Sequence, residues 1–339
     1  TPEQVVEALA RTAAWLGKNP EDTFVRTAFL GFAERKGTPE QVVEAFARTA
    51  AWLGKNPEDT SVRTAFLGFV KRHGMPDHVQ LALQETRSWL EGHDVDEALL
   101  AAYLKLLRTS GRQDQVKEAL QLTEGWLLEH PSSSGVRWAY AALAHSRGSS
   151  KEKASALSIA QTATADEGTA EAQDFAWVGT LHLDLREYAE ARKAYESAID
   201  EFKYYGMGHR GKGLALEGLG RLDDAETELK EGLRCAKHQG RPTMAHLNSL
   251  GWFYLRRERP AEAESVFREA TEARRKEGQA ADVFNWWGLG EALMRQGRYQ
   301  EAADALRSAL DVAPSWLGQP ASTDIPGLIS ECERLAGLG

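Results

Sequence analysis

Eight residues from Gly206 to Gly213, "GMGHRGKG", match two phosphate-binding patterns at once. Gly206, Gly208 and Gly211 fit the G-x-G-x-x-G of a dinucleotide-binding turn. The stretch that ends at Lys212 also fits the G-x-x-x-x-G-K of a P-loop. Both sites require a β-strand before the glycines, and a P-loop requires Ser or Thr directly after its lysine. No strand pattern precedes these residues and Gly213 follows the lysine, so the glycines need another explanation.

Other side chains capable of chemistry are present but scattered. His73 and His78 flank a Gly-Met-Pro turn with no third ligand nearby, so we interpret them as exposed turn residues. Cys235 and Cys332 lack the paired spacing of a zinc ribbon or a disulfide framework. No Ser–His–Asp set or G-x-S-x-G elbow stands out, and carboxylates alternate with Lys and Arg as on solvated helix faces. We expect no enzymatic activity, no catalytic residues, no metal and no cofactor.

Composition and charge exclude two further classes. The 339 residues carry a formal net charge of -9, with acidic and basic residues interspersed. Nucleic-acid-binding proteins usually show a basic stripe, because neutralising phosphates supplies most of their affinity, so we expect no nucleic-acid partner. The sequence contains no run of 18 apolar residues and no signal-peptide pattern at its start. We expect a cytoplasmic protein with no membrane partner.

Internal repetition is the strongest signal in the sequence. Residues 1–37 recur at 38–74 with five changes, and the period continues with drift through 75–111 and 112–148. One tryptophan, always followed by leucine, recurs every 37 residues, which we interpret as a core position. These tryptophans are Trp15, Trp52, Trp89 and Trp126.

Each 37-residue unit is predicted to form two helices. Residues 1–4, "TPEQ", form a capping box with proline at the first helical position, in which Thr1 and Gln4 exchange hydrogen bonds. This helix is expected to reach Leu16 and to end at a left-handed Gly17. Residues 19–22, "NPED", are expected to open the second helix in the same way, and Gly37 to end it. The second helix carries an apolar stripe for one buried face, at Val25, Ala28, Phe29, Phe32 and Ala33.

The second half of the chain repeats less strictly. Four segments align, beginning at Arg186, Gly220, Glu258 and Gly297. The last copy resembles the tetratricopeptide repeat, with its W-x-x-L-G-x-x-Y, G-x-Y-x-x-A and closing proline. The resemblance is clear over 170–314, and the 37-residue units look like a longer-turn variant. The matching residues are Trp286, Leu289, Gly290, Leu293, Gly297, Tyr299, Ala302, Leu306, Ala309 and Pro314.

The alignment of these copies explains the glycine-rich stretch. Gly213 falls in a column of small residues that, in the family, lets the two helices of one repeat approach closely. We therefore interpret the stretch as helix packing rather than a phosphate site. Lys212 stands where other copies have Leu250 and Leu289, so its packing differs. The column consists of Gly179, Gly213, Gly251 and Gly290.

The resemblance implies an all-α fold, a right-handed α-solenoid of about eighteen helices stacked in pairs. We expect four helical repeats at 1–148, a transitional helix at 149–168, four tetratricopeptide-type repeats at 169–316 and a capping helix at 317–339. The chain opens on the second helix of a pair, so Thr1 is expected to be a boundary within a longer protein. Trp177, Trp286 and Trp316 are assigned to packing. The capping helix has one apolar face, with Ile325, Leu328, Ile329, Cys332 and Leu335.

In the family, the face opposite the partner helix lines a concave groove for peptides. Trp252 and Trp287 fall on this face, where they are either exposed for binding or packed against a neighbouring helix. Interface hot spots are enriched in Trp and Arg. The Lys/Asn carboxylate clamp of some family members is not reproduced. The candidate groove residues here are Arg210, Glu217, Asn248, Trp252, Arg256, Phe284, Trp287, Glu291 and Arg295.

A tenth candidate comes from the two nearly identical units. Phe24 is replaced by Ser61 in the second unit. Losing a buried phenylalanine costs about 3–5 kcal/mol, so we expect this position to be exposed and to face the groove.

The function that these patterns favour is a non-catalytic module that binds a protein or peptide partner. The near-identical units also resemble the sensor arrays of bacterial STAND-type signalling NTPases, which implies a sensor or scaffold arm. Two alternatives stay open: an array that regulates a linked effector enzyme, and a structural spacer without a ligand. The unpaired first helix also makes self-association possible.

Overall fold

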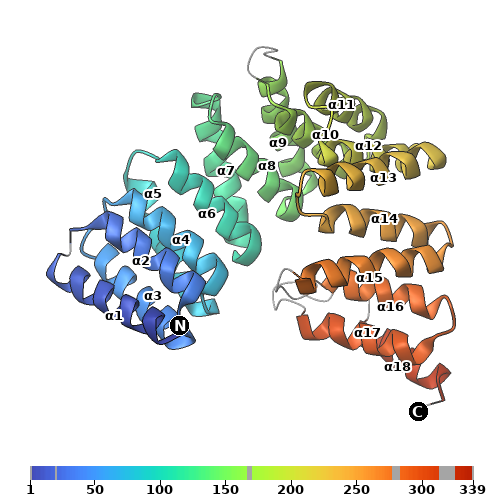
Figure 1. The fold of residues 1–339 in the computed structure, drawn as a ribbon. Coiled ribbons are helices and arrows are strands. Elements are labelled where there is room, and N and C mark those ends of the chain that lie inside the picture. Colours follow the sequence, from blue (N-terminus) through green and yellow to red (C-terminus); the bar gives the residue numbers. More distant parts are fainter. Residues whose placement is uncertain (1, 20, 166–169, 277–282, 313–324, 338–339) are drawn as a thin grey trace. The chain divides into compact units, whose positions relative to one another are not determined.

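The computed structural model describes residues 2–19, 21–165, 170–276, 283–312 and 325–337 (Figure 1). These residues form 18 α-helices and no β-strand, so the predicted all-α fold is confirmed. The chain divides into two compact units, unit 1 (residues 1–167) and unit 2 (residues 168–339). Within each unit, helices that follow one another in sequence stack side by side.

Unit 1 contains nine helices arranged around its even-numbered members. The helices α2, α4, α6 and α8 contact one another in succession, and each odd-numbered helix packs beside its sequence neighbours. The helices are α1 (Pro2–Lys18), α2 (Thr23–Lys36), α3 (Pro39–Leu53), α4 (Thr60–His73), α5 (Pro76–Gly92), α6 (Glu97–Ser110), α7 (Gln113–Glu129), α8 (Ser134–Arg147) and α9 (Ser150–Thr164).

The predicted capping box is present at the start of α3. The Gln41 backbone N–H donates to the Thr38 hydroxyl, and the Gln41 side chain accepts a bond from the Thr38 backbone. Each bond satisfies a backbone N–H that has no partner within the helix. The equivalent Thr1 lies outside the described residues.

The predicted cap of the second helix is wrong by three residues. Asp22, not Asn19, caps α2, because its carboxylate accepts a bond from the Val25 backbone N–H at 2.9 Å. The Asn19 amide instead donates to the Trp15 carbonyl at 3.1 Å, so it satisfies the end of α1. Pro20 lies outside the described residues.

The predicted left-handed glycine at the end of the first helix is also wrong. Gly17 lies inside α1, and the equivalent Gly54 ends α3 with a right-handed φ of -63°. Gly37 is extended, with its N–H donating to the Ala33 carbonyl at 2.8 Å. The helices of unit 1 therefore end without the left-handed conformation that favours glycine.

The apolar stripe of α2 is only partly buried. Phe29 and Ala33 are buried, Val25 and Phe32 are half-buried, and Ala28 is exposed, contrary to prediction. Among the even-numbered helices α2 contacts only α4, whereas α4 lies between α2 and α6. A helix with one such neighbour buries a narrower face.

In unit 1, two of the repeated tryptophans each pack against an arginine from the preceding 37-residue repeat. The Arg26 guanidinium lies 4.5 Å from the Trp52 ring centroid, and Arg63 lies 6.0 Å from that of Trp89. Trp15 has no such arginine over its ring among the described residues and is largely exposed, so its prediction as a core residue is wrong. Exposed fractions are 51% for Trp15 and 7% for Trp52 and Trp89, and Trp126 is half-buried.

Unit 2 is built from four helix pairs and one final helix. Figure 1 shows successive helices running back and forth along the stack. The helices are α10 (Ala172–Asp184), α11 (Tyr188–Glu201), α12 (Gly206–Gly218), α13 (Leu222–His238), α14 (Met244–Arg256), α15 (Pro260–Lys276), α16 (Val283–Met294), α17 (Tyr299–Val312) and α18 (Ile325–Leu335).

The predicted column of close-packing glycines is confirmed. In every pair, a Cβ built on this glycine would lie under 3.0 Å from a side chain of the second helix, closer than real contacts allow. The side chain comes sixteen residues later each time. The shortest distances are 2.8 Å for Gly179 to Tyr195, 2.8 Å for Gly213 to Leu229, 2.6 Å for Gly251 to Phe267 and 2.7 Å for Gly290 to Leu306.

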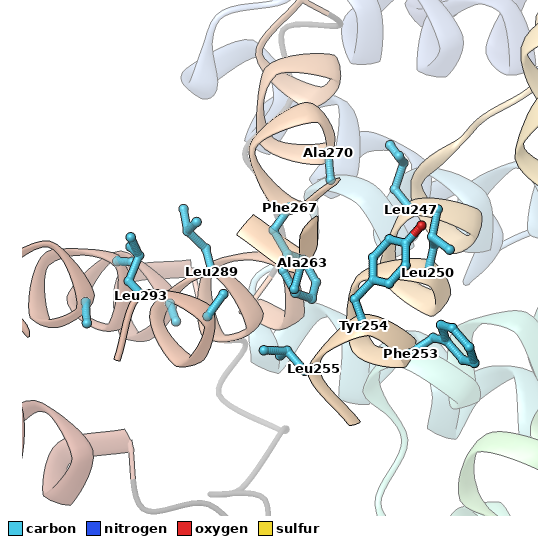
Figure 2. Close-up of a cluster of buried hydrophobic side chains, with 14 of the residues drawn as sticks. Leu247, Leu250, Phe253, Tyr254, Leu255, Ala263, Phe267, Ala270, Leu289 and Leu293 are labelled. Atoms are coloured by element: carbon cyan, nitrogen blue, oxygen red, sulfur yellow. The ribbon is translucent and has the colours of Figure 1, made fainter. Parts of the chain in front are cut away.

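The two aromatic rings that these glycines contact are also contacted by a glycine of the following pair. The Phe267 ring, at the centre of the core in Figure 2, lies between Gly251 of α14 and Gly288 of α16. Cβ atoms there would come within 2.6 and 2.3 Å of the ring. Tyr195 lies in the same way between Gly179 and Gly211. We call this arrangement the glycine–ring contact.

The glycine-rich stretch at 206–213 is therefore part of a packed helix. It forms the first turns of α12, so its backbone N–H groups do not make a phosphate loop. Lys212, in the column where leucine is usual, pairs with Glu228 at 2.8 Å and with Glu196 at 3.6 Å. These carboxylates lie on the two helices that flank α12, which explains how a lysine is accommodated.

The final helix packs on α17 as a partly buried cap. Ile325 and Cys332 are buried and Leu328 and Ile329 are half-buried, as the apolar face predicts. Leu335 is 41% exposed, so its assignment to that face is wrong. Trp316 and residues 313–324 lie outside the described residues.

Replacing the close-packing glycine tests this account of unit 2. Gly251→Ala should lower the free energy of unfolding by about 1–3 kcal/mol, because the methyl group overpacks the rigid Phe267 ring. Gly125→Ala is the matched control, since Gly125 is an exposed glycine of α7 with nothing within 4 Å of its Cβ position. That change should raise stability by about 0.5–1 kcal/mol. Thermal unfolding followed by circular dichroism compares them, and equal stabilisation by both would contradict the packing argument.

Candidate partner-binding groove and adjoining pocket

The predicted groove residues lie on two surfaces. Phe24 lies on α2 of unit 1 and is 83% exposed, as its replacement by Ser61 predicts. The other nine all lie on α12, α14 and α16 of unit 2. The residues on α12 are Arg210 and Glu217. Those on α14 are Asn248, Trp252 and Arg256, and those on or directly after α16 are Phe284, Trp287, Glu291 and Arg295.

Polar contacts join α12 to α14. Arg256 forms a bidentate ion pair with Glu217, with N···O distances of 2.6 and 2.8 Å. Arg210 donates to the Ser249 hydroxyl at 3.1 Å. No carboxylate pairs with Arg210 within the described parts of the chain, and burial lowers the pKa of its guanidinium while Tyr195 opposes this shift. Arg210 therefore brings an uncompensated positive charge to this layer.

Aromatic rings join α14 to α16. The rings of Trp252 and Trp287 meet edge to face with centroids 4.8 Å apart, and Phe284 lies 6.4 Å from Trp287. Trp252 also meets the buried Phe267 ring at 5.7 Å. Both tryptophans are half-buried against the core of unit 2, whereas Phe284 is 43% exposed. We call Trp252, Phe284 and Trp287 the aromatic cluster.

The remaining charged residues of the set are already paired. Arg295 donates to Glu291 and to the Leu255 carbonyl, both at 2.6 Å. With the pair formed by Arg256 and Glu217, this leaves little net charge near the aromatic cluster. Such exposed pairs contribute little to stability.

A pocket beside the predicted groove residues was not predicted from the sequence. The start of α12, the end of α13 and the start of α14 line an open pocket of about 470 Å³. Its walls are largely apolar, and Asn248 belongs to both the groove set and the pocket. The lining includes Tyr205, Met207, Pro242, Met244, His246 and Asn248.

His246 is the most unusual group in this pocket. It is 3% exposed, and among the described residues its ring nitrogens make no hydrogen bond of good geometry, although the Gly206 backbone lies close enough to interact with the ring. Its Nε2 edge lies against the backbones of Gly206 and Gly232, which have no Cβ to displace it. Burial, with the positive charge of Arg210, lowers the pKa of His246 to about 4, and the Gly206 backbone opposes this only in part. The imidazole is therefore neutral at pH 7.

One sequence signal does point to His246. Five residues before each close-packing glycine, the copies carry Asp174, Gly208, His246 and Asn285. The three polar members are all buried. A polar column inside an otherwise apolar helix face marks buried hydrogen-bonding sites, but the alignment alone does not show that a cavity adjoins one of them.

Possible metal ligands come together at one place in the described chain. Ligand atoms of His209, Glu231 and Cys235 lie within 4.8 Å of one another. However, His209 already contacts Glu228 at 2.7 Å and the Lys203 carbonyl, and Glu231 holds Arg234. These side chains are better explained as an ion-pair network than as a metal site.

The two turn histidines lie apart from this network. His73 is exposed, as predicted. His78 is half-buried, because its ring stacks on Phe46 with centroids 3.7 Å apart. The prediction of a freely exposed His78 is therefore wrong.

Comparison with known proteins agrees with this repeat geometry. The family model described as tetratricopeptide repeat matches residues 179–240 and 249–315. These two segments of the chain are thus similar to tetratricopeptide repeats. The matched segments contain α11–α13 and α15–α17, together with most groove residues. Among curated proteins, no sequence matches this chain.

Solved structures share the stacked tetratricopeptide-repeat fold. A repeat protein from Parabacteroides merdae is 14% identical, with a TM-score of 0.53 over 98% of this chain and 99% of its own. Yeast Tom70 is 12% identical, with a TM-score of 0.58 over 92% of this chain and 64% of its own. A chain of the APC/C hetero-tetramer Cut9–Hcn1 is 15% identical, with a TM-score of 0.52 over 96% of this chain and 58% of its own. At these identities the likeness concerns the fold alone.

Across the described ranges, no helix combines the length and apolar character needed to cross a bilayer.

The pKa of His246 predicts a pH effect on the stability of these repeats. The folded pKa of about 4 lies below the ordinary 6.5, so the unfolded chain binds more protons between these values. Stability from this group is complete above pH 6.5 and falls as the pH drops towards 4, by about 3 kcal/mol. Urea unfolding at several pH values should show a smaller acid loss in His246→Phe. An NMR titration placing the parent imidazole near pH 6.5 would contradict the buried, neutral assignment.

Proposed function

We propose that this chain is a non-catalytic interaction module that binds a protein or peptide partner along α12, α14 and α16. The observation that carries the proposal is the aromatic cluster, where Phe284 exposes 43% of its surface beside Trp252 and Trp287. Aromatic anchors set on a rigid layer are typical of interface hot spots. In Cut9–Hcn1, a protein of similar fold assembles with another protein, which is consistent with this use.

The charges of the layer favour a partner of particular chemistry. Glu217 and Glu291 are already paired with arginines, so a partner gains little by competing for them. Arg210, in contrast, has no carboxylate partner within the described ranges. A partner that places an apolar side chain on the aromatic cluster and an acidic group near Arg210 would satisfy both features.

The wider role we propose is that of a sensor or scaffold arm in a larger bacterial signalling protein. Its support is the near-identity of residues 1–37 and 38–74, which is typical of recently duplicated sensor arrays. Regulation of a linked effector enzyme is the alternative within the same setting. A coding sequence upstream with an NTPase or protease domain would support this role, and its absence would favour a free-standing module.

Self-association through α1 is a second candidate, favoured by one observation. Trp15 is 51% exposed, whereas its equivalents Trp52 and Trp89 are covered by arginines. A second copy that covers Trp15 would give it the same burial. We expect Trp15→Glu to convert any dimer to monomer in light scattering coupled to gel filtration. A parent chain that is monomeric at about 100 μM, where even weak pairs of about 10 μM affinity would form, contradicts this candidate.

Substitution of Phe284 tests the groove directly. Phe284→Ala should reduce recovery of a specific partner from source lysate by about tenfold or more, because truncating a hot-spot residue costs at least about 2 kcal/mol. Phe202→Ala is the matched control, since Phe202 is 42% exposed but lies at the end of α11. Quantitative mass spectrometry of both pull-downs measures the effect. A partner retained equally by Phe284→Ala and Phe202→Ala would place binding outside this groove.

A further inference from the structure

We propose that one face of α1 and α2, which we call the end face, binds a helix pair of the same 37-residue repeat type on a partner chain, with an arginine of that pair stacked on Trp15. The end face shares no residue with the groove on α12, α14 and α16, so the inference goes beyond the proposed groove. It also differs from self-association, because its occupant is not a second copy. The end face consists of Ala8, Thr12, Trp15, Val25 and Phe32.

Two repeats of nearly the same sequence identify the end face. Residues 1–37 and 38–74 carry identical side chains at these positions, yet every one of them is more exposed in the first repeat. Trp15 is 51% exposed, for example, whereas Trp52 is 7% exposed. Because the side chains are the same, the difference in burial comes from their neighbours. The buried counterparts in the second repeat are Ala45, Thr49, Trp52, Val62 and Phe69.

The neighbour that makes this difference is a preceding helix pair. In the second repeat, α2 packs against both α3 and α4. The other neighbours of the two repeats are equivalent, since α2 contacts α4 as α4 contacts α6. In the described parts of the chain, no helix packs on α1 and α2 as α2 packs on α3 and α4. The contact between the first two repeats therefore shows which kind of helix pair fits the end face.

The chemistry of the occupant follows from what covers Trp52. The Arg26 guanidinium lies 4.5 Å from the Trp52 ring centroid, and Arg26 is only 4% exposed. Burial lowers the pKa of Arg26, and the negative charge of Asp59 opposes this shift, so the carboxylate attracts the guanidinium. On the end face, Trp15 and Asp22 occupy the positions that Trp52 and Asp59 have in the second repeat. An incoming guanidinium would therefore meet both an indole ring and a carboxylate.

A second copy of this chain cannot offer such an arginine without opening its own repeats. The arginines at this position of the repeat are all buried, and two of them already stack on tryptophans of their own chain. A partner whose last repeat leaves this arginine uncovered can use it without that loss. We therefore assign the end face to a partner chain. The three buried arginines are Arg26, Arg63 and Arg137.

A synthetic peptide tests this assignment on the full chain. The probe has the sequence of residues 1–37 with Trp15→Ser, which removes the ring of its own end face and keeps Arg26. Fluorescence anisotropy of the labelled peptide should give a dissociation constant of about 100 μM or tighter. Hydrogen exchange in α1 of the chain should slow when the peptide is bound. No binding at about 1 mM peptide would overturn the proposal.

Variants on both sides locate the contact. Arg26→Ala in the peptide and Trp15→Ser in the chain should each weaken binding by about fivefold or more, because each removes the stacking of cation on ring. Val6→Ser in the chain is the matched control, since Val6 and its equivalent Val43 are 45% and 47% exposed and so lie outside the covered face. Equal affinities of the Trp15→Ser and Val6→Ser chains would contradict the assignment. The Arg26→Ala peptide tests the parent chain even if a chain variant fails to fold, and its unchanged affinity would overturn the role of the arginine.

Light scattering of the parent chain distinguishes the possible occupants. A parent that is monomeric at about 100 μM and binds the peptide supports a partner chain. A dimer that dissociates in Trp15→Ser would assign the end face to a second copy and overturn the proposal. The peptide test uses no lysate protein, so its outcome is independent of the groove and of the partner recovered there.

Discussion

The packing of unit 2 depends on the glycine–ring contact. Phe267 and Tyr195 each project from the second helix of a pair and meet glycines of their own pair and of the next. Each ring therefore sets the distance between three helices. Where the second helix carries the smaller Leu229, the following helix has Ser249 instead of glycine. A large side chain on one helix is thus matched by a glycine on the helix that faces it, as expected of a close-packed interior.

This packing also determines which side chains of unit 2 stay at the surface. Since Phe267 fills the space behind α14 and α16, Trp252 rests on it and supports Trp287 at the surface. The aromatic cluster is thus supported from behind by a buried ring, and a side chain already held by packing loses little conformational entropy when a partner covers it. Unit 1 uses a different contact, in which arginines such as Arg26 cover the repeated tryptophans, so its surface retains mainly isolated apolar groups such as Phe24.

The pocket arises from the same use of glycine. Gly206 and Gly232 let α12 and α13 approach each other, and His246 lies against both backbones at the edge of this contact. Its neutral state follows from burial beside Arg210. The polar groups of unit 2 thus include paired ions such as Glu217 with Arg256, which satisfy each other, and buried atoms without a hydrogen bond of good geometry, such as Asn248 Oδ1.

The sequence alone determined the helical class, the repeat period and the close-packing glycines, because these depend on local periodicity and on residue size at fixed spacing. It also indicated that Phe24 is exposed, since a core position would not accept serine. The burial of Trp15, Ala28 and Leu335 was decided only by the tertiary structure, because burial depends on which neighbours a helix has. The pocket beside His246 likewise exists only where three helix ends meet, and no local pattern records that distance.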